Sequence, residues 1–287
     1  MKKVLKFILP ILPIIIFVVS CNKPGRPALG DYPKDTNPPG GPLKFYTAFD
    51  GTSTDPLKNA VDSIRANFPS DNPLSFIQGI SGRAVQGKDQ KAIKYPSAND
   101  FAKSTSFTVA FWEKNSVPTG GSPQWIFSLV DKDYWHNSGM FAFVDHDGAG
   151  SNATGAVVKF AVEDHWFEFT PSNGLMPGNL LNNSWHHLAF VYDETTSKMT
   201  YYVDGQALTG LKPALTDFKD NGVAHGKINL NPESVSNLVV GGWNKQAGLK
   251  GPSDPWIQSW QGGLDQFRLY SKALSASDIL ALYNTKM

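Results

Sequence analysis

The chain has 287 residues, 41% of them hydrophobic and 12% aromatic, and its formal net charge at pH 7 is +1. A balance this close to neutral, without a basic run, excludes the electrostatic footprint of a nucleic-acid-binding protein. The single cysteine excludes an internal disulfide, so an apolar core must hold the fold together.

The first twenty residues have the features of a bacterial signal peptide. Lys2, Lys3 and Lys6 precede an apolar run over residues 7–19. That run is shorter than the roughly 20 residues that span a bilayer, but its length suits the hydrophobic region of a signal peptide. It ends in Val-Val-Ser-Cys21, which resembles a bacterial lipobox. We therefore expect residues 1–20 to be removed and the Cys21 thiol to carry a diacylglycerol.

A lipidated Cys21 would anchor the protein in the cell envelope, since two acyl chains give stable membrane attachment. The alternative is an ordinary buried cysteine behind a signal anchor. We expect the anchor to lie in the outer membrane. Residues 22–26 lack an acidic cluster resembling the surface-export signal of Bacteroidetes. Whether the anchored protein faces the periplasm or the outside of the cell therefore stays open. Residues 21–43 are rich in proline and glycine, which predicts a semi-extended tether.

Residues 44–287 are predicted to form one β-rich domain. The segment 106–112 alternates large and small side chains, as a strand with one buried face does. Asp204-Gly205 is a strong two-residue hairpin signal, and Ser275 with Asp278 forms a capping box for one C-terminal helix. Comparable strand-like runs lie at 124–130, 139–144, 156–162, 166–170, 185–192, 199–203, 237–241 and 264–270.

Three segments resemble the concanavalin A-like lectin/glucanase superfamily, in particular its bacterial laminin G-like (pentraxin-like) branch. They are SFTVAFWE at 106–113, SWHHLAFVYDETTSKMTYYVDG at 184–205 and GLDQFRLYSKALSASDILALY at 263–283. Upstream, residues 49–52 and 82–85 fit the opening of that domain. The resemblance implies an all-β jelly-roll β-sandwich of two curved antiparallel sheets with one short C-terminal helix. Ligands of such folds are usually met on the concave face or its rim loops.

The residues do not indicate an enzyme. Hydrolases of this superfamily carry a Glu-x-Asp-x-Glu run on one strand, and the chain has none. Glu163 and Glu168 have a spacing that places them on opposite strand faces. The segment 145–148 is as consistent with a turn as with a catalytic pair. His186 and His187 are neighbours within a strand, so they face opposite sides and cannot chelate one ion.

The eight tryptophans divide into two groups. The resemblance assigns Trp112 and Trp185 to packing, and Trp125 and Trp260 lie in or beside apolar strands. The other four lie in polar, turn-rich surroundings, where an indole can stack on a sugar ring while amides and carboxylates bind hydroxyls. The alternative is that they cap one end of the sandwich. The candidate carbohydrate-binding residues are Trp135, His136, Asp133, Asn137, Trp243, Asn244, Trp166 and Trp256.

The resemblance also implies one structural Ca²⁺ where the first and last strands meet. Asp50 and Asp265 are the candidate ligands by position, and Ca²⁺ prefers carboxylate and carbonyl oxygens. The alternative is that Asp50 begins a turn and Asp265 makes a hydrogen bond within its strand.

The expected function is a membrane-anchored, non-catalytic carbohydrate-binding module that serves polysaccharide capture, with a glycan as partner. The fold leaves two alternatives open. One is a protein-binding or adhesive laminin G-like module with a partner at the cell surface. The other, less favoured, is a glycoside hydrolase.

Overall fold

The computed structural model describes residues 41–50, 69 and 71–286. The predicted signal peptide, Cys21 and residues 21–40 of the predicted tether lie outside these residues. Within the described part, no helix combines the length and the apolarity needed to cross a bilayer.

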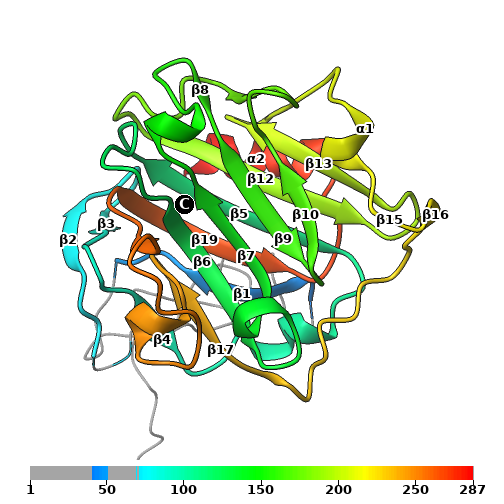
Figure 1. The fold of residues 1–287 in the computed structure, drawn as a ribbon, viewed down its shortest axis with the longest axis horizontal. Helices are drawn as coiled ribbons and strands as arrows, with labels where there is room; N and C mark the ends of the chain where they lie inside the picture. The colour runs from blue at the N-terminus through cyan, green and yellow to red at the C-terminus, as the bar shows by residue number, and fades with distance from the viewer. Residues whose placement is uncertain (1–40, 51–68, 70, 287) are drawn as a thin grey trace, which may run out of the picture. The chain divides into compact units, whose positions relative to one another are not determined.

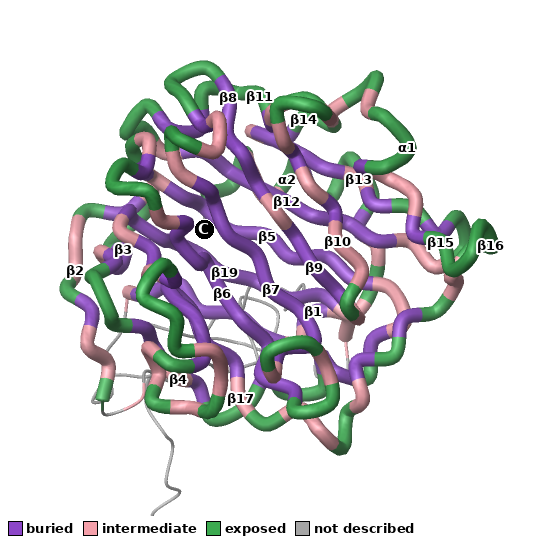
Figure 2. Tube along the Cα trace, viewed as in Figure 1, coloured by how far each residue is buried: buried purple, intermediate pink, exposed green. Residues whose placement is uncertain are grey.

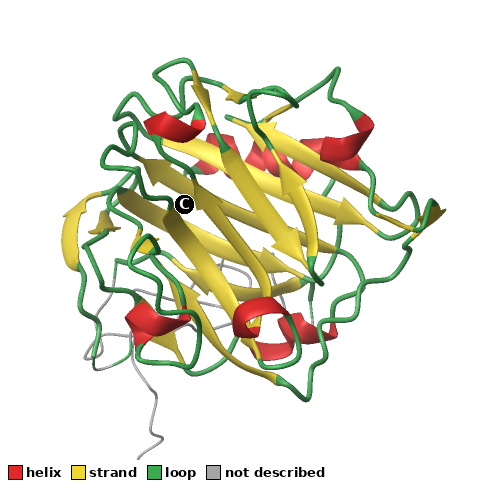
Figure 3. Ribbon diagram, viewed as in Figure 1, coloured by secondary structure: helices red, strands yellow, loops and turns green. Residues whose placement is uncertain are grey.

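Two sheets face each other as layers (Figures 1 and 3). The first has the strand order β14-β13-β12-β5-β19-β3-β2, with β1 paired to β19, and all of its pairings are antiparallel. Its strands are β1 (Leu43–Thr47), β2 (Ser75–Gln78), β3 (Arg83–Gln86), β5 (Phe107–Lys114), β12 (His186–Asp193), β13 (Lys198–Val203), β14 (Gln206–Ala207) and β19 (Gly263–Tyr270).

The second sheet has the order β10-β9-β7-β6-β17-β4. These strands are antiparallel, and the short β18 joins the edge of β6 in parallel. Its strands are β4 (Ile93–Tyr95), β6 (Gln124–Asp131), β7 (Ser138–Val144), β9 (Val158–Val162), β10 (His165–Glu168), β17 (Val235–Val240) and β18 (Gln258–Ser259).

Smaller elements lie between these strands. Two short ribbons pair β8 (Gly155–Ala156) with β11 (Met176–Pro177), and β15 (Lys219–Asp220) with β16 (Val223–Ala224). The α-helices are α1 (Pro213–Thr216) and α2 (Ala276–Thr285), and the 3-10 turns are η2 (Asn99–Lys103), η3 (Trp135–Asn137), η4 (Asp147–Ala149) and η5 (Asn244–Ala247).

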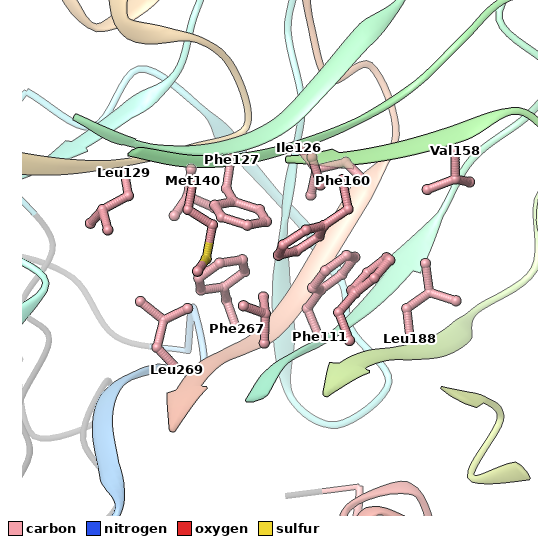
Figure 4. Packing of buried hydrophobic residues seen from close by; sticks show 14 of the residues in the cluster. Phe111, Ile126, Phe127, Leu129, Met140, Val158, Phe160, Leu188, Phe267 and Leu269 are labelled. Carbon is pink, nitrogen blue, oxygen red and sulfur yellow. The ribbon is translucent and has the colours of Figure 1, made fainter. Parts of the chain in front are cut away.

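The main core lies between the two sheets. Figure 4 shows Phe127 and Phe160 of the second sheet pointing toward Phe111 and Phe267 of the first. The ring centroids of Phe127 and Phe267 are 5.5 Å apart, and those of Phe111 and Phe267 are 5.7 Å apart. Buried residues run along both layers (Figure 2). Side chains alternate along a strand, so away from the bulges in β6 and β19 every second residue enters this core.

The fold class predicted from sequence is confirmed: the chain is a β-sandwich of two antiparallel sheets with a short C-terminal helix. Asp204 and Gly205 form the hairpin turn, both with positive φ, of 51° and 77°. The capping box is also present, since the Asp278 N–H donates to the Ser275 hydroxyl over 3.2 Å and the Ser275 N–H donates back to the Asp278 carboxylate over 3.0 Å.

The packing role expected of Trp112 is confirmed, and that of Trp185 is met only in part. Trp112 is buried, but on the outer face of the first sheet, where its ring stacks on Tyr283 of α2 at 5.5 Å. It therefore contributes to the seat of the helix and not to the core between the sheets. Trp185 is only half-buried. His186 and His187 do face opposite sides: His186 pairs with Asp204 at 2.9 Å, and His187 lies beside Trp112.

Candidate functional site

The outer face of the second sheet carries aromatic side chains where water-facing residues would ordinarily be polar. In β7, Met140 and Ala142 enter the main core, whereas Phe141 and Phe143 point the other way. These two rings form a second apolar cluster with Trp125, Ala161, Trp243 and Ile257. This face is therefore either covered or used for binding.

Cross-strand pairing fixes which residues share this face. Phe143 of β7 lies opposite Lys159 of β9, and Lys159 lies opposite Glu168 of β10. Two residues farther along β9, on the same face, Ala161 lies between Phe141 of β7 and Trp166 of β10. Cross-strand neighbours lie on the same side of a sheet. One row thus carries the charged pair Lys159 and Glu168 next to Phe143, and the other carries the rings of Phe141 and Trp166.

A groove of about 710 Å³ lies over these rows. Four loops contribute to its walls: the one before β6, the η3 turn, the one after β7 and the one before β18. Its lining residues are Gly121, Pro123, Trp125, Trp135, Phe143, Asp145, His146, Lys159, Trp166, Glu168 and Trp256.

Trp135 is held in one wall by its own turn. The residues after it, His136 and Asn137, have positive φ values of 50° and 62°, which turn the chain sharply back into β7. The Trp135 N–H donates to the Asp164 carboxylate over 2.8 Å. Its ring, 37% exposed, meets that of Trp166 edge-on at 5.3 Å. The indole is therefore positioned before any ligand arrives.

Trp256 stands in another wall and is 45% exposed. Its ring lies 5.8 Å from that of Trp125, which forms the groove floor. The Ile257 N–H donates to the Asp254 carbonyl over 3.1 Å, and the Gln258 side chain donates to the Pro255 carbonyl over 2.9 Å. Both bonds brace the turn that carries Trp256.

The polar groups gather on one side of the groove. The Lys159 ammonium lies 3.6 Å from the Asp145 carboxylate and 3.7 Å from that of Glu168. Asp145 also pairs with the His146 imidazole at 2.8 Å. A pocket with flat apolar surfaces and a few fixed polar groups can orient a ligand that has both an apolar face and hydrogen-bonding edges.

Of the candidate residues from sequence, the structure brings Trp135, Trp166 and Trp256 together in the groove. Trp243 and Asn244 need correction as ligand contacts, because both are completely buried. The Trp243 ring supports Trp135 and Trp125 from below, at 6.1 and 5.2 Å.

Asn244 and the residues around Trp135 have structural partners. The Asn244 side chain accepts from the Ser128 hydroxyl at 2.6 Å and donates to the Asn137 carbonyl at 2.7 Å. Asp133 accepts from the Ser234 hydroxyl, and His136 packs its ring against Trp135. Asp133, His136 and Asn137 are not among the residues that line the groove.

Sequence reasoning did not identify the polar side of the groove. The segment 145–148 was read as equally consistent with a turn or a catalytic pair. Glu168 was considered only with Glu163, as a carboxylate pair of the wrong spacing, and Lys159 carried no motif. A usable signal was present in β7, where Phe141 and Phe143 occupy the positions that alternate with the core set. Glu163 lies apart from Glu168, since its carboxylate pairs with His225 at 2.9 Å.

Asp50 and Asp265 lie near each other beside the turn that joins β2 to β3. Asp265 is wholly buried: one carboxylate oxygen accepts the Ile80 N–H over 2.8 Å, and the other, Oδ1, has no hydrogen-bond partner. Asp50 accepts the Arg83 N–H over 2.5 Å. Burial, and after it the charge of Asp50, raises the pKa of Asp265 from 3.8 to about 7.

The carboxyl groups of Asp50 and Asp265 are the kind of ligand that Ca²⁺ prefers. The unpartnered Oδ1 becomes a carboxylate oxygen, the type of ligand that Ca²⁺ takes, once Asp265 ionises. No group of three His, Cys, Asp or Glu side chains that could hold a metal occurs among the described residues. Backbone carbonyls or water would therefore have to complete such a site.

Residues 86–280 match the profile of the Laminin_G_3 family, described as the concanavalin A-like lectin/glucanases superfamily. None of the curated proteins matches the chain. Among solved structures, the chain is similar to domain 4 of an extracellular arabinanase from Geobacillus stearothermophilus, in complex with arabinotriose. The TM-score is 0.50 and the identity 14%, over 84% of this chain and 98% of that one.

Two further structures are similar to the chain. The binding domain of botulinum neurotoxin serotype G has a TM-score of 0.48 and 13% identity, covering 85% of this chain and 51% of that one. The CBM40 domain of Ruminococcus gnavus IT-sialidase has a TM-score of 0.46 and 14% identity, covering 70% and 96%.

The raised pKa of Asp265 predicts a pH dependence of stability. Asp265 stays protonated in the folded chain up to about pH 7 but ionises near pH 3.8 when unfolded. The folded state thus binds more protons between these values, and its stability falls as pH rises through them. At about 1.4 kcal/mol per pKa unit, the loss is on the order of 4 kcal/mol.

Comparison with Asp265→Asn isolates this effect. Burial lowers the pKa of His187 to about 3, which makes stability rise with pH up to about 6.5 in both proteins alike. We expect the wild type to lose stability relative to Asp265→Asn between pH 4 and pH 7, measured by urea unfolding in the presence of EDTA. A difference that stays constant with pH would contradict the assignment.

Proposed function

From the premise that this chain belongs to the concanavalin A-like lectin/glucanases superfamily, we propose that it is a non-catalytic carbohydrate-binding module whose ligand lies in the tryptophan groove. The observation that carries the proposal is the convergence of Trp135, Trp166 and Trp256 on one groove from three separate segments. Exposed indoles are costly to keep in water, and two of these three are exposed.

The groove fits a sugar because it offers both kinds of contact that a pyranose or furanose ring needs. The indole faces can pack against the C–H face of a ring. Asp145 and Glu168 accept hydrogen bonds from hydroxyls, and Lys159 donates them. Two carboxylates against one ammonium leave a net negative groove, so the favoured ligand is a neutral glycan. Acidic sugars would be repelled.

Solved structures of this fold guide the choice of first probe. The arabinanase domain was solved with arabinotriose, a neutral oligosaccharide. We therefore place arabinan first in a panel of neutral polysaccharides that also includes galactan, xylan, mannan and β-glucan. The likeness supports the fold, and the groove supports the class of ligand.

A second candidate function is glycoside hydrolysis, because Asp145 and Glu168 both line the groove. Glycosidases use two carboxylates across the scissile bond, one of them protonated as the acid. Here a single ammonium lies 3.6 and 3.7 Å from the two groups and occupies the space between them. This arrangement favours binding over bond cleavage.

Removing the indoles tests the site. We expect Trp166→Ala and Trp135→Ala each to weaken retention in affinity gels about tenfold or more, since buried aromatic contacts dominate binding energies. Trp185→Ala is the matched control: Trp185 is half-buried and lies outside the groove, so its loss should leave retention unchanged. Circular dichroism checks that each variant folds.

Two results would overturn the proposal. One is wild-type protein that is retained by none of the polysaccharides, which would favour a protein-binding module. The other is release of reducing ends from any of them that is lost in Glu168→Gln, which would favour the hydrolase.

We also propose a structural Ca²⁺ held by Asp50 and Asp265, supported by the unpartnered Oδ1 of Asp265. The ion would bind ionised carboxylates, so it should raise the melting temperature more at pH 8 than at pH 5. Asp265→Asn should show no calcium response. An equal response in that variant, measured by thermal unfolding with Ca²⁺ or EDTA, would refute the site.

The anchor is likewise a proposal, supported by the lipobox-like residues before Cys21. A lipid on Cys21 would place the module in the cell envelope, in our proposal at the outer membrane, where it would capture polysaccharide. Cells that express the full chain should incorporate labelled palmitate into it, and Cys21→Ser should abolish both the label and fractionation with membranes. Label retained in Cys21→Ser would contradict the assignment.

A further inference from the structure

The tryptophan groove shares a wall with a second hollow. The wall is the segment that leads into β6. Gly121 and Pro123 of this segment face the groove, whereas Gly120, Ser122 and Gln124 face the other side. A Cβ atom at Gly120 or Gly121 would meet no atom within 4 Å outside the neighbouring residues of the chain, so the space beside these two glycines is open. A bound chain could cross it at this point.

The hollow beyond the wall has a volume of about 290 Å³ and is lined by carboxamides. They are Gln124, Gln258 and Gln261, accompanied by the hydroxyls of Thr119 and Ser122. Gln261 also lines a third hollow of about 440 Å³, together with Gln78, Gln86, Asn115 and Asn183. The three hollows therefore follow one another: the segment leading into β6 separates the groove from the second hollow, and Gln261 lines both the second and the third.

Several of these amides are fixed in place by one another. The Gln124 Oε1 accepts from the Asn115 side chain over 3.0 Å and from the Gln261 N–H over 3.1 Å. The Gln261 carbonyl in turn accepts from the Gln86 side chain. Gln258 spans the junction with the groove, since its side chain also braces the turn that carries Trp256. Polar groups held in this way cost little entropy on binding.

We propose that the two amide-lined hollows continue the binding site, so that the chain takes several consecutive units of a neutral polysaccharide and not a single terminal sugar. This inference rests on the proposed function of the groove. The chemistry supports it, because each carboxamide both donates and accepts and thus matches sugar hydroxyls. Among the residues that the structure describes, Asp89 and Lys114 are the only charged side chains that line the two hollows.

The aromatic groove and the amide hollows have different parts in this site. Stacking in the groove supplies most of the affinity for a short ligand, since an oligosaccharide of two sugar units reaches only the indoles. Hydrogen bonds in the hollows add affinity only when the ligand is long enough to cross the Gly120–Gly121 wall. Affinity should therefore rise with chain length.

The test compares short and long ligands on the full chain. Affinity gels containing arabinan, galactan, xylan, mannan and β-glucan identify the polymers that are retained. For each of these, displacement is then measured with its own oligosaccharides of two and of eight units. The variants are Gln261→Ala/Asn183→Ala, in the hollows, and Gln206→Ala as a control in the exposed β14.

We expect the eight-unit oligosaccharide to bind wild-type protein about tenfold more tightly than the two-unit one, since two or three net hydrogen bonds amount to such a factor. Gln261→Ala/Asn183→Ala should abolish this difference and leave the two-unit affinity unchanged, and Gln206→Ala should behave as wild type. Equal affinities for both lengths in wild-type protein would overturn the inference while leaving the groove intact. Retention on no polymer would overturn the proposed function itself.

Discussion

The second sheet is packed on both of its faces, and the rest of the molecule is arranged around that constraint. All eight residues of β6 are buried. On one side Phe127 faces Phe267 at 5.5 Å across the main core, and on the other Trp125 lies against Phe143 at 4.4 Å. A slip of one residue would exchange the two sets. The register is therefore fixed strongly, and with it the positions of the polar groups on the outer face.

This rigidity matters for binding because the tryptophans of the groove come from separate parts of the chain. Trp166 belongs to β10, and Trp135 and Trp256 belong to turns that rest on the outer cluster. Trp243 fills the space beneath them without reaching the ligand side. Loops that rest on a packed aromatic layer lose little further freedom when a ligand binds, which favours affinity.

The ionisable groups buried in the first sheet differ from those of the groove in their exposure to solvent. Glu113 and His187 are buried within the first sheet, where loss of solvation raises the pKa of the former and lowers that of the latter to about 3. Burial thus favours the neutral form of each group. The charges of the groove are instead partly exposed and share one ammonium, that of Lys159. The groove charges are therefore accessible to a ligand, whereas Glu113 and His187 are not.

Local sequence determined the class of fold. Period-two alternation, the Asp204-Gly205 turn and the Ser275–Asp278 capping box each depend on residues close in the chain, and each appears where it was expected. The polar, turn-rich sequence around Trp135 and Trp256 also identified these two as candidates, and both are exposed. Such features could be read without tertiary structure because neighbouring residues suffice to produce them.

Only the tertiary structure decided which residues share a surface. Trp243 lies in a sequence context much like that of Trp256, yet one is buried and the other exposed, because η5 folds back under the outer cluster. Asp145, Lys159 and Glu168 carry no motif and meet through the pairing of three strands. Pairing between distant strands depends on the packing of the whole sandwich, which no local pattern encodes.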